Sequence, residues 1–198
     1  ILHSLTSKGV KNSILLERST IGSGSTGRSS GAIRMHYSTE VNARLALESL
    51  QIFANFDEIV GGDVGFVETG YMVFAPDHAR EGFLENIEMQ RSVGIDTRVI
   101  SLDEARELGP AFRLDEDEHF AWESHSGHAD PSATASAYIS KARSLGAQVI
   151  LDTPVLNLQI GETGTHRVVT EKESFEAPTV VIATGPWSGD FLSKLGID

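Results

Sequence analysis

Three stretches of the sequence hold residue types that bind the sugars and phosphates of nucleotides. Glu17 ends the short apolar run at residues 13–16, and an acidic residue at such a strand end can accept hydrogen bonds from ribose hydroxyls. The loop GSGSTGRSSGAIR, residues 22–34, offers backbone amides and hydroxyls that could surround a pyrophosphate. The run VVIATGPW, residues 180–187, would let the backbone pass close to a bound molecule. The order of these stretches, rather than any one of them, indicates a nucleotide cofactor.

The loop at residues 22–34 is not a Walker phosphate loop, because no Gly-Lys-Ser/Thr follows it. Arg28 and Arg34 place cationic donors beside it in a chain whose formal net charge is −12. His125 and His128 could be metal ligands or flavin attachment sites, but loop and cap roles are commoner, and we expect no metal site.

The elements that must position these residues alternate between strand and helix at both ends of the chain. We expect strands over 13–17, 147–152 and 179–183, because each is a short apolar run bounded by turn residues. We expect one helix that ends at Gly9, a second over the apolar repeat at 39–59, and a third from Asp130-Pro131 to Gly146. We expect a hairpin over 155–170.

The middle of the chain has a different pattern. Residues 65–75 alternate around Thr69-Gly70 and predict a hairpin, residues 77–93 predict a helix, and Ser101 opens a capping box after a short strand. The acidic residues 114–119 suit a solvated loop or hairpin end. The fold class is therefore α/β: a Rossmann-like nucleotide-binding domain interrupted by an α+β domain, both incomplete.

Composition excludes several classes of function. The net charge of −12 argues against nucleic-acid binding, which needs clustered Lys and Arg. The chain has 0 Cys, so disulfides, thiolate metal sites and cysteine nucleophiles are excluded and a cytoplasmic location is compatible. No apolar run reaches the roughly 18 residues of a transmembrane helix.

In combination, the Gly/Ser/Arg loop, the Asp-Pro helix and the Ala-Thr-Gly-Pro-Trp turn resemble the FAD-dependent D-amino-acid oxidase and sarcosine oxidase superfamily. The sequence is most similar to the beta subunits of sarcosine oxidase and proline dehydrogenase, over essentially all 198 residues. The resemblance implies a FAD-binding domain over residues 1–62 and 128–198 and part of a substrate-binding domain over 63–127. It also implies a Gly-rich phosphate loop before Ile1 and further catalytic strands after Asp198.

The resemblance assigns roles to particular residues. Arg34 would hold the substrate carboxylate, and His36 and Tyr37 would line the substrate pocket. Glu17 would bind the ribose. The other residues that would contact FAD are Arg18, Ser25, Thr26, Arg28, Ser29, Ser30, Gly31, Val155, Ala183, Thr184, Gly185 and Trp187.

The implied activity is oxidation of the C–N bond of an amino acid or N-methylated amino acid, such as sarcosine, dimethylglycine, proline or a D-amino acid. Other subunits of a hetero-oligomeric enzyme are candidate partners. Three alternatives stay open. The chain could be a binding or assembly subunit without flavin, a Rossmann enzyme that uses a nicotinamide cofactor, or an inactive fragment. The Ala-Thr-Gly turn late in the chain favours a flavoprotein over a nicotinamide enzyme.

Overall fold

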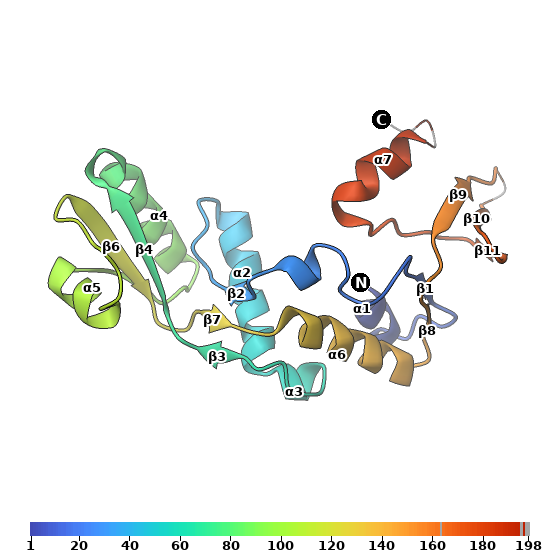
Figure 1. Ribbon diagram of the computed structural model, residues 1–198, viewed down its shortest axis with the longest axis horizontal. Helices are drawn as coiled ribbons and strands as arrows, with labels where there is room; N and C mark the ends of the chain where they lie inside the picture. Colours follow the sequence, from blue (N-terminus) through green and yellow to red (C-terminus); the bar gives the residue numbers. More distant parts are fainter. Residues whose placement is uncertain (163, 195, 197–198) are drawn as a thin grey trace. The chain divides into compact units, whose positions relative to one another are not determined.

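The computed structural model describes residues 1–162, 164–194 and 196, and the chain forms two compact units (Figure 1). The first unit comprises residues 1–28 and 138–198, and the second comprises residues 29–137. The sequence predicts domain boundaries at 62/63 and 127/128, so the two divisions differ. Because the units group residues by contact and the predicted domains group them by role, the domain assignment stays a prediction.

The first unit contains a pair of parallel strands. Helix α1 (Leu2–Ser7) ends before Gly9, whose φ of 83° is the left-handed conformation that glycine adopts readily. Strand β1 (Ile14–Leu16) pairs in parallel with β8 (Gln148–Ile150), which confirms the predicted pairing type. Ile14 remains 42% exposed, so the expectation of a buried strand is wrong. In the described part of the chain β8 is the only neighbour of β1, and a parallel strand is buried only when its surroundings are complete.

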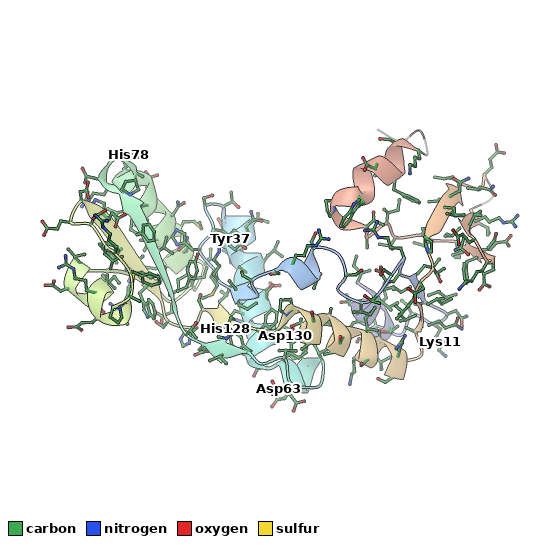
Figure 2. All side chains as sticks on the ribbon, viewed as in Figure 1. Lys11, Tyr37, Asp63, His78, His128 and Asp130 are labelled. Carbon is green, nitrogen blue, oxygen red and sulfur yellow. The ribbon has the colours of Figure 1, made fainter. Side chains whose placement is uncertain are left out.

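Helix α6 (Pro131–Ser144) has residues in both units and begins at the predicted cap. Asp130 Oδ1 accepts hydrogen bonds from the N–H groups of Ser132 and Ala133 at 2.7 and 3.0 Å. These amides have no partner within the helix, so the carboxylate stabilises its first turn. In Figure 2 Asp130 lies at the start of this helix, just after His128.

A three-stranded antiparallel sheet follows β8 in the first unit. Strands β9 (Val155–Gln159), β10 (His166–Thr170) and β11 (Ser174–Ala177) lie in the order β11-β10-β9. The pairing of β9 with β10 confirms the predicted hairpin, although Thr163 in its turn lies outside the described residues. Gly161 is required there, because a Cβ at this position would lie 1.9 Å from the carbonyl oxygen of Thr165.

The strand predicted over 179–183 is absent, since these described residues pair with no other strand. Val181 is 52% exposed. The apolar run has the composition of a buried strand, but a strand also needs a neighbour to complete its hydrogen bonds, and composition cannot supply that. The segment leads into the 3₁₀ turn η3 (Gly185–Trp187) and helix α7 (Ser188–Ser193).

The second unit begins with a helical region and a small sheet. The predicted helix over 39–59 is divided at Asn55 into α2 (Glu40–Ala54) and α3 (Phe56–Ile59). The small sheet has the order β2-β7-β3, with strands β2 (Ala32–Ile33), β7 (Gly127–His128) and β3 (Val67–Glu68). Met35, which follows β2, is buried with Ala43, Leu50 and Ile95 in one apolar cluster.

The predicted hairpin over 65–75 is wrong. Strand β3 pairs with β7, whereas β4 (Tyr71–Pro76) pairs with β6 (Glu118–Glu123) in a different sheet. Gly70 stands between β3 and β4 with φ of 71°, and a Cβ there would lie 1.9 Å from the ring of Trp122. The glycine therefore marks the passage from one sheet to the next rather than a hairpin turn.

The second sheet of this unit has the order β4-β6-β5 and a helix on each face (Figure 1). Its third strand is β5 (Thr97–Ile100); the helices are α4 (Arg80–Ser92), after the turn η2 (Asp77–Ala79), and α5 (Leu102–Leu108). Phe120 packs with Ala105 of α5, while its neighbour Ala121 packs with Phe83 of α4. Successive strand residues point to opposite faces, so the helices cover opposite faces. The predicted cap is confirmed, because Ser101 Oγ accepts a hydrogen bond from the N–H of Glu104.

Candidate functional site

Glu17 follows β1, and its side chain folds back onto the chain. Its Oε1 accepts a hydrogen bond from the N–H of Ser19 at 2.9 Å. The backbone of Glu17 donates to the carbonyl of Ile150 and accepts from the N–H of Thr153, both at 2.9 Å. These bonds place Glu17 beside the segment that leads into Val155. Glu17 and Val155, two of the predicted cofactor residues, therefore lie in neighbouring segments of the first unit.

Arg18 and Trp187, both predicted cofactor residues, are in contact in the first unit. The Arg18 guanidinium carbon lies 4.7 Å from the centroid of the Trp187 ring, a cation–π distance. A Cβ added at Gly24 would lie 3.5 Å from the same ring. Trp187, in the late Ala-Thr-Gly-Pro-Trp turn, therefore lies close both to Arg18, which follows β1, and to Gly24 in the Gly-rich loop.

The Gly-rich loop folds into turns and the 3₁₀ helix η1 (Thr26–Arg28). The N–H of Gly27 donates to the carbonyl of Gly22 at 2.8 Å, and the N–H of Arg28 donates to the carbonyl of Ser25 at 3.2 Å. The side chains of Ser25, Thr26 and Arg28 are exposed, as are Ala183, Thr184 and Gly185 in the late turn. The hydroxyls and the guanidinium are therefore accessible to a ligand.

The predicted residues Ser29, Ser30 and Gly31 belong to the second unit. Ser29 and Ser30 are both exposed, and Ser29 Oγ accepts a hydrogen bond from the N–H of Gly31 at 3.1 Å. Gly31 has φ of 74°, and a Cβ there would lie 2.2 Å from the carbonyl oxygen of Ala129. Only glycine allows the chain to pass this close to the segment before α6.

Arg34 stands in an aromatic setting formed by two tyrosines. Its guanidinium carbon lies 4.9 Å from the ring centroid of Tyr37 and 5.7 Å from that of Tyr71. Nη1 donates a 2.6 Å hydrogen bond to the carbonyl of His36. Within the described residues no other nitrogen of this guanidinium has a protein hydrogen-bond partner. The edge that carries Nε and Nη2 is therefore available for a planar anion such as a carboxylate.

His36 lies against a fully buried carboxylate. Its Nδ1 is 3.7 Å from Oε1 of Glu123, whose exposed fraction is 0%. This distance is too long for a hydrogen bond, and neither atom has another partner among the described residues. Burial lowers the pKa of His36, the Glu123 carboxylate opposes that change and the Arg34 guanidinium adds to it. The neutral form of the imidazole is consequently favoured relative to an exposed histidine.

Glu123, Gln90 and Tyr71 complete this cluster, and sequence reasoning missed all three. Glu123 Oε2 accepts hydrogen bonds from the N–H of Met35 at 3.0 Å and from Ser126 Oγ at 2.7 Å. Gln90 Nε2 donates to the carbonyl of Tyr37 at 3.1 Å. Tyr71 and Glu123 are directly paired across β4 and β6. A signal was available, since Glu123 is a charged residue that directly follows the apolar residues 120–122 of β6.

His125 and His128 do not join this cluster. Nδ1 of His125 lies 3.4 Å from Glu68 Oε2, and its Nε2 lies 3.7 Å from Asp96 Oδ2, on a side chain that is 55% exposed. His128 is an exposed residue of β7. Among the residues that the structure describes, no group of three or more His, Asp or Glu side chains could hold a metal ion.

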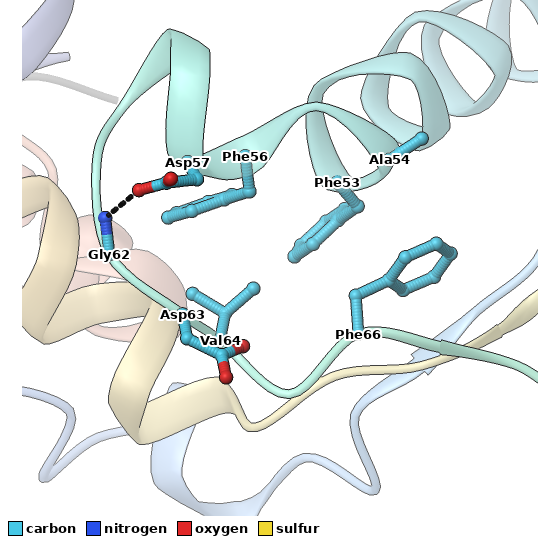
Figure 3. A pocket seen from close by; sticks show the side chains of 8 residues that line it. All are labelled: Phe53, Ala54, Phe56, Asp57, Gly62, Asp63, Val64 and Phe66. Carbon is cyan, nitrogen blue, oxygen red and sulfur yellow. Dashed lines mark hydrogen bonds between the residues drawn. The ribbon is translucent and has the colours of Figure 1, made fainter.

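A depression of mixed polar and apolar lining lies between the end of α2, α3 and the approach to β3 (Figure 3). The rings of Phe53, Phe56 and Phe66 line it together with Asp57 and Asp63. Both carboxylates accept hydrogen bonds from nearby backbone N–H groups, of Gly62 at 2.9 Å and Gly65 at 2.8 Å. These bonds shape the loop, and none of the residues around Arg34 lines the depression.

Comparison with known proteins identifies the class. Residues 1–198 match the family described as FAD dependent oxidoreductase, and the chain belongs to this family. The resemblance inferred from the sequence is thereby confirmed.

Individual relatives are more distant. The chain is 25% identical to mitochondrial sarcosine dehydrogenase of Homo sapiens over 203 residues, which are 99% of this chain and 22% of that protein. It is 24% identical to mitochondrial dimethylglycine dehydrogenase of Rattus norvegicus, over 100% of this chain and 23% of that protein. The crystal structure of L-proline dehydrogenase from P. horikoshii matches with a TM-score of 0.90 and 30% identity, over 100% of this chain and 52% of that chain.

These matches confirm the predicted α/β fold class, with both domains incomplete: the chain spans 52% of the solved structure and 22% of the first curated relative. The described residues contain no helix long and apolar enough to cross a membrane.

Proposed function

We propose that this chain is the cofactor- and substrate-binding part of an enzyme that oxidises the C–N bond of an amino acid or N-methylated amino acid, with FAD as cofactor. The observation that carries the proposal is the Arg34 guanidinium beside Tyr37 and Tyr71, with one edge free for a carboxylate. A guanidinium binds a carboxylate through two parallel hydrogen bonds, which fixes the orientation of the bound molecule as well as its charge.

The residues present fit FAD in each unit taken by itself. In the first unit, Glu17 lies beside the strand that leads to Val155, and Arg18 lies over Trp187. In the second unit, the exposed residues Ser29 and Ser30 present hydroxyls to a ligand, and Gly31 lets the chain pass close to the carbonyl of Ala129. Glu17 would hold the ribose, and Val155 would face the adenine. By the resemblance, the exposed residues from Ser25 to Ser30 and from Ala183 to Trp187, and the backbone of the buried Gly31, would contact the remainder of the cofactor.

FAD, when bound, would supply the acceptor for the hydride equivalent of the C–H bond next to the substrate nitrogen, so that the C–N bond becomes the C=N bond of an imine. Arg34 would hold the carboxylate of the substrate, and the bond from Nη1 to the His36 carbonyl would keep the guanidinium plane fixed. Burial lowers the pKa of His36, which disfavours a second positive charge beside Arg34. We assign no general base, because a substrate that binds with a neutral amine needs none. Water would then hydrolyse the imine product.

An absorption spectrum of the protein, expressed with its native flanking sequence, tests the proposal. We expect a flavin spectrum that is bleached under anaerobic conditions by sarcosine, proline or a D-amino acid. A colourless, folded protein that does not bind added FAD would support the alternative of a non-catalytic subunit or an inactive fragment. A flavin spectrum that none of these compounds bleaches would refute the proposed substrate class while leaving the cofactor in place.

Two further proposals concern the setting of the enzyme. The absence of cysteine is compatible with a cytoplasmic location, which localisation of a tagged full-length protein would test. Association with other subunits is proposed from the resemblance to beta subunits, and co-purification of the native protein would test it.

A further inference from the structure

The segment from Arg34 to Ser38 connects β2 to α2 without secondary structure of its own. It nevertheless carries the side chain on which the proposed substrate binding depends. A segment of this kind keeps one conformation only if other parts of the protein hold its backbone polar groups. The hydrogen bonds to this backbone therefore decide where the Arg34 guanidinium lies.

Two side chains from other elements make those bonds. Gln90 of α4 donates to the carbonyl of Tyr37 at 3.1 Å, and Glu123 of β6 accepts from the N–H of Met35 at 3.0 Å. The Met35 side chain is 1% exposed, so its backbone is fixed from the apolar cluster as well. Met35 lies between Arg34 and His36, and the carboxylate therefore acts at the centre of the segment.

Glu123 is an unusual residue to find in this place. Its side chain is fully buried, and a buried carboxylate is costly unless hydrogen bonds compensate for the lost hydration. Oε2 has two such bonds, from the Met35 N–H and from Ser126 Oγ, whereas Oε1 has none and faces His36 Nδ1 at 3.7 Å. A residue that served packing alone would not need a charge here.

We propose that Glu123 is a positioning residue for substrate binding: its buried carboxylate holds the Met35 N–H and thereby fixes the orientation of Arg34. The inference rests on the proposed function, because it requires Arg34 to bind a carboxylate. Acceptance of the Met35 N–H is the essential property. An amide oxygen can accept the same bond, so Glu123→Gln preserves the arrangement and Glu123→Ala destroys it.

Acetate serves as the probe in the full-length protein with its cofactor, and its dissociation constant is measured by NMR titration of the Arg34 Nε–H signal. We expect Glu123→Ala to weaken acetate binding roughly tenfold or more, because small displacements of a positioning group are expensive. We expect Glu123→Gln to stay within about threefold of the wild type, since it retains the acceptor. Glu118→Gln, a change of the same kind at the other end of β6, is the matched control and should leave acetate binding unchanged.

A second variant covers the case in which Glu123→Ala does not fold. Ser126→Ala removes the hydroxyl that holds Glu123 Oε2, and we expect it to weaken acetate binding about threefold while the protein stays folded. A pH titration of the His36 imidazole signals, recorded by NMR, checks the charge at residue 123. In a separate pH titration, loss of the neighbouring negative charge in Glu123→Gln should lower the pKa of the His36 imidazole further, and this confirms that the substitution removes the charge while acetate binding is retained.

The outcomes separate this inference from the proposed function. Wild-type acetate affinity in Arg34→Ala would overturn both. Weakened binding in Arg34→Ala together with unchanged binding in Glu123→Ala and Ser126→Ala would overturn the positioning role alone. Equal losses in Glu123→Gln and Glu123→Ala would also overturn it, because charge rather than hydrogen bonding would then be decisive.

Discussion

Replacing Gly31 by alanine should destabilise the second unit for two separable reasons. The φ of 74° costs an L-residue about 1–2 kcal/mol, because the left-handed conformation brings its Cβ close to the following carbonyl. The added Cβ would also lie 2.2 Å from the carbonyl oxygen of Ala129, well inside contact distance. The N–H of Ala129 donates to the carbonyl of Gly31 at 3.0 Å, so the two segments cannot separate without losing a bond.

A matched control isolates the second contribution. Gly65 has a similar φ of 62°, but a Cβ there would meet nothing within 4 Å. Gly65→Ala should therefore lose only the conformational part, while Gly31→Ala loses a further 1–3 kcal/mol or so from overpacking. The stiffening of the unfolded chain that accompanies any Gly→Ala change affects both variants alike and cancels in the difference.

Urea unfolding followed by circular dichroism measures this difference. With an m value of roughly 1–3 kcal/mol per molar urea, we expect the midpoint of Gly31→Ala to lie about 1 M below that of Gly65→Ala. Equal midpoints would refute the reasoning, because they would show that the chain relaxes around a Cβ without cost. The same comparison bears on function, since a shifted Gly31 backbone should also weaken FAD binding, whereas Gly65→Ala should not.

Three further predictions concern the candidate site. Arg34→Ala should raise KM for a carboxylate substrate about 30-fold or more, from the loss of roughly 2 kcal/mol or more for a charged hydrogen-bonded pair, while the flavin spectrum stays unchanged; an unaltered KM would reject the carboxylate role. Glu17→Ala should weaken FAD binding, measured by fluorescence titration, and wild-type affinity would reject the ribose role. His36 has a folded pKa below its usual 6.5, so the unfolded state binds more protons and stability should fall as pH drops below about 6.5. His36→Gln should flatten that dependence in thermal unfolding at a series of pH values, and an unchanged dependence would count against it.

The residues around Arg34 show what the sequence could and could not predict. Arg34, His36 and Tyr37 are neighbours in the chain, so a resemblance to a family was enough to single them out together. Tyr71 and Glu123 come together only because β4 and β6 pair in one particular register, across many intervening residues. No pattern within either strand specifies that register, and Glu123 was therefore missed although it directly follows the apolar residues 120–122.

The elements show the same division between local and non-local information. Ser101 and Asp130 were predicted as helix caps because a cap is made by residues within one turn of one another. The incorrect hairpin over 65–75 and the absent strand over 179–183 both concern strand partners. Alternation and apolar composition indicate that a segment is extended, but its partner is chosen by the rest of the chain.

The two tryptophans of this protein belong to different units. Trp122 lies in β6 of the second unit against Gly70, and Trp187 lies in the first unit, 38% exposed beneath the Arg18 guanidinium. Each unit thus carries its own intrinsic fluorophore, in an environment unlike that of the other. Replacing either indole by phenylalanine would leave a single emitter, so that the unfolding of one half of the molecule could be followed optically without a signal from the other.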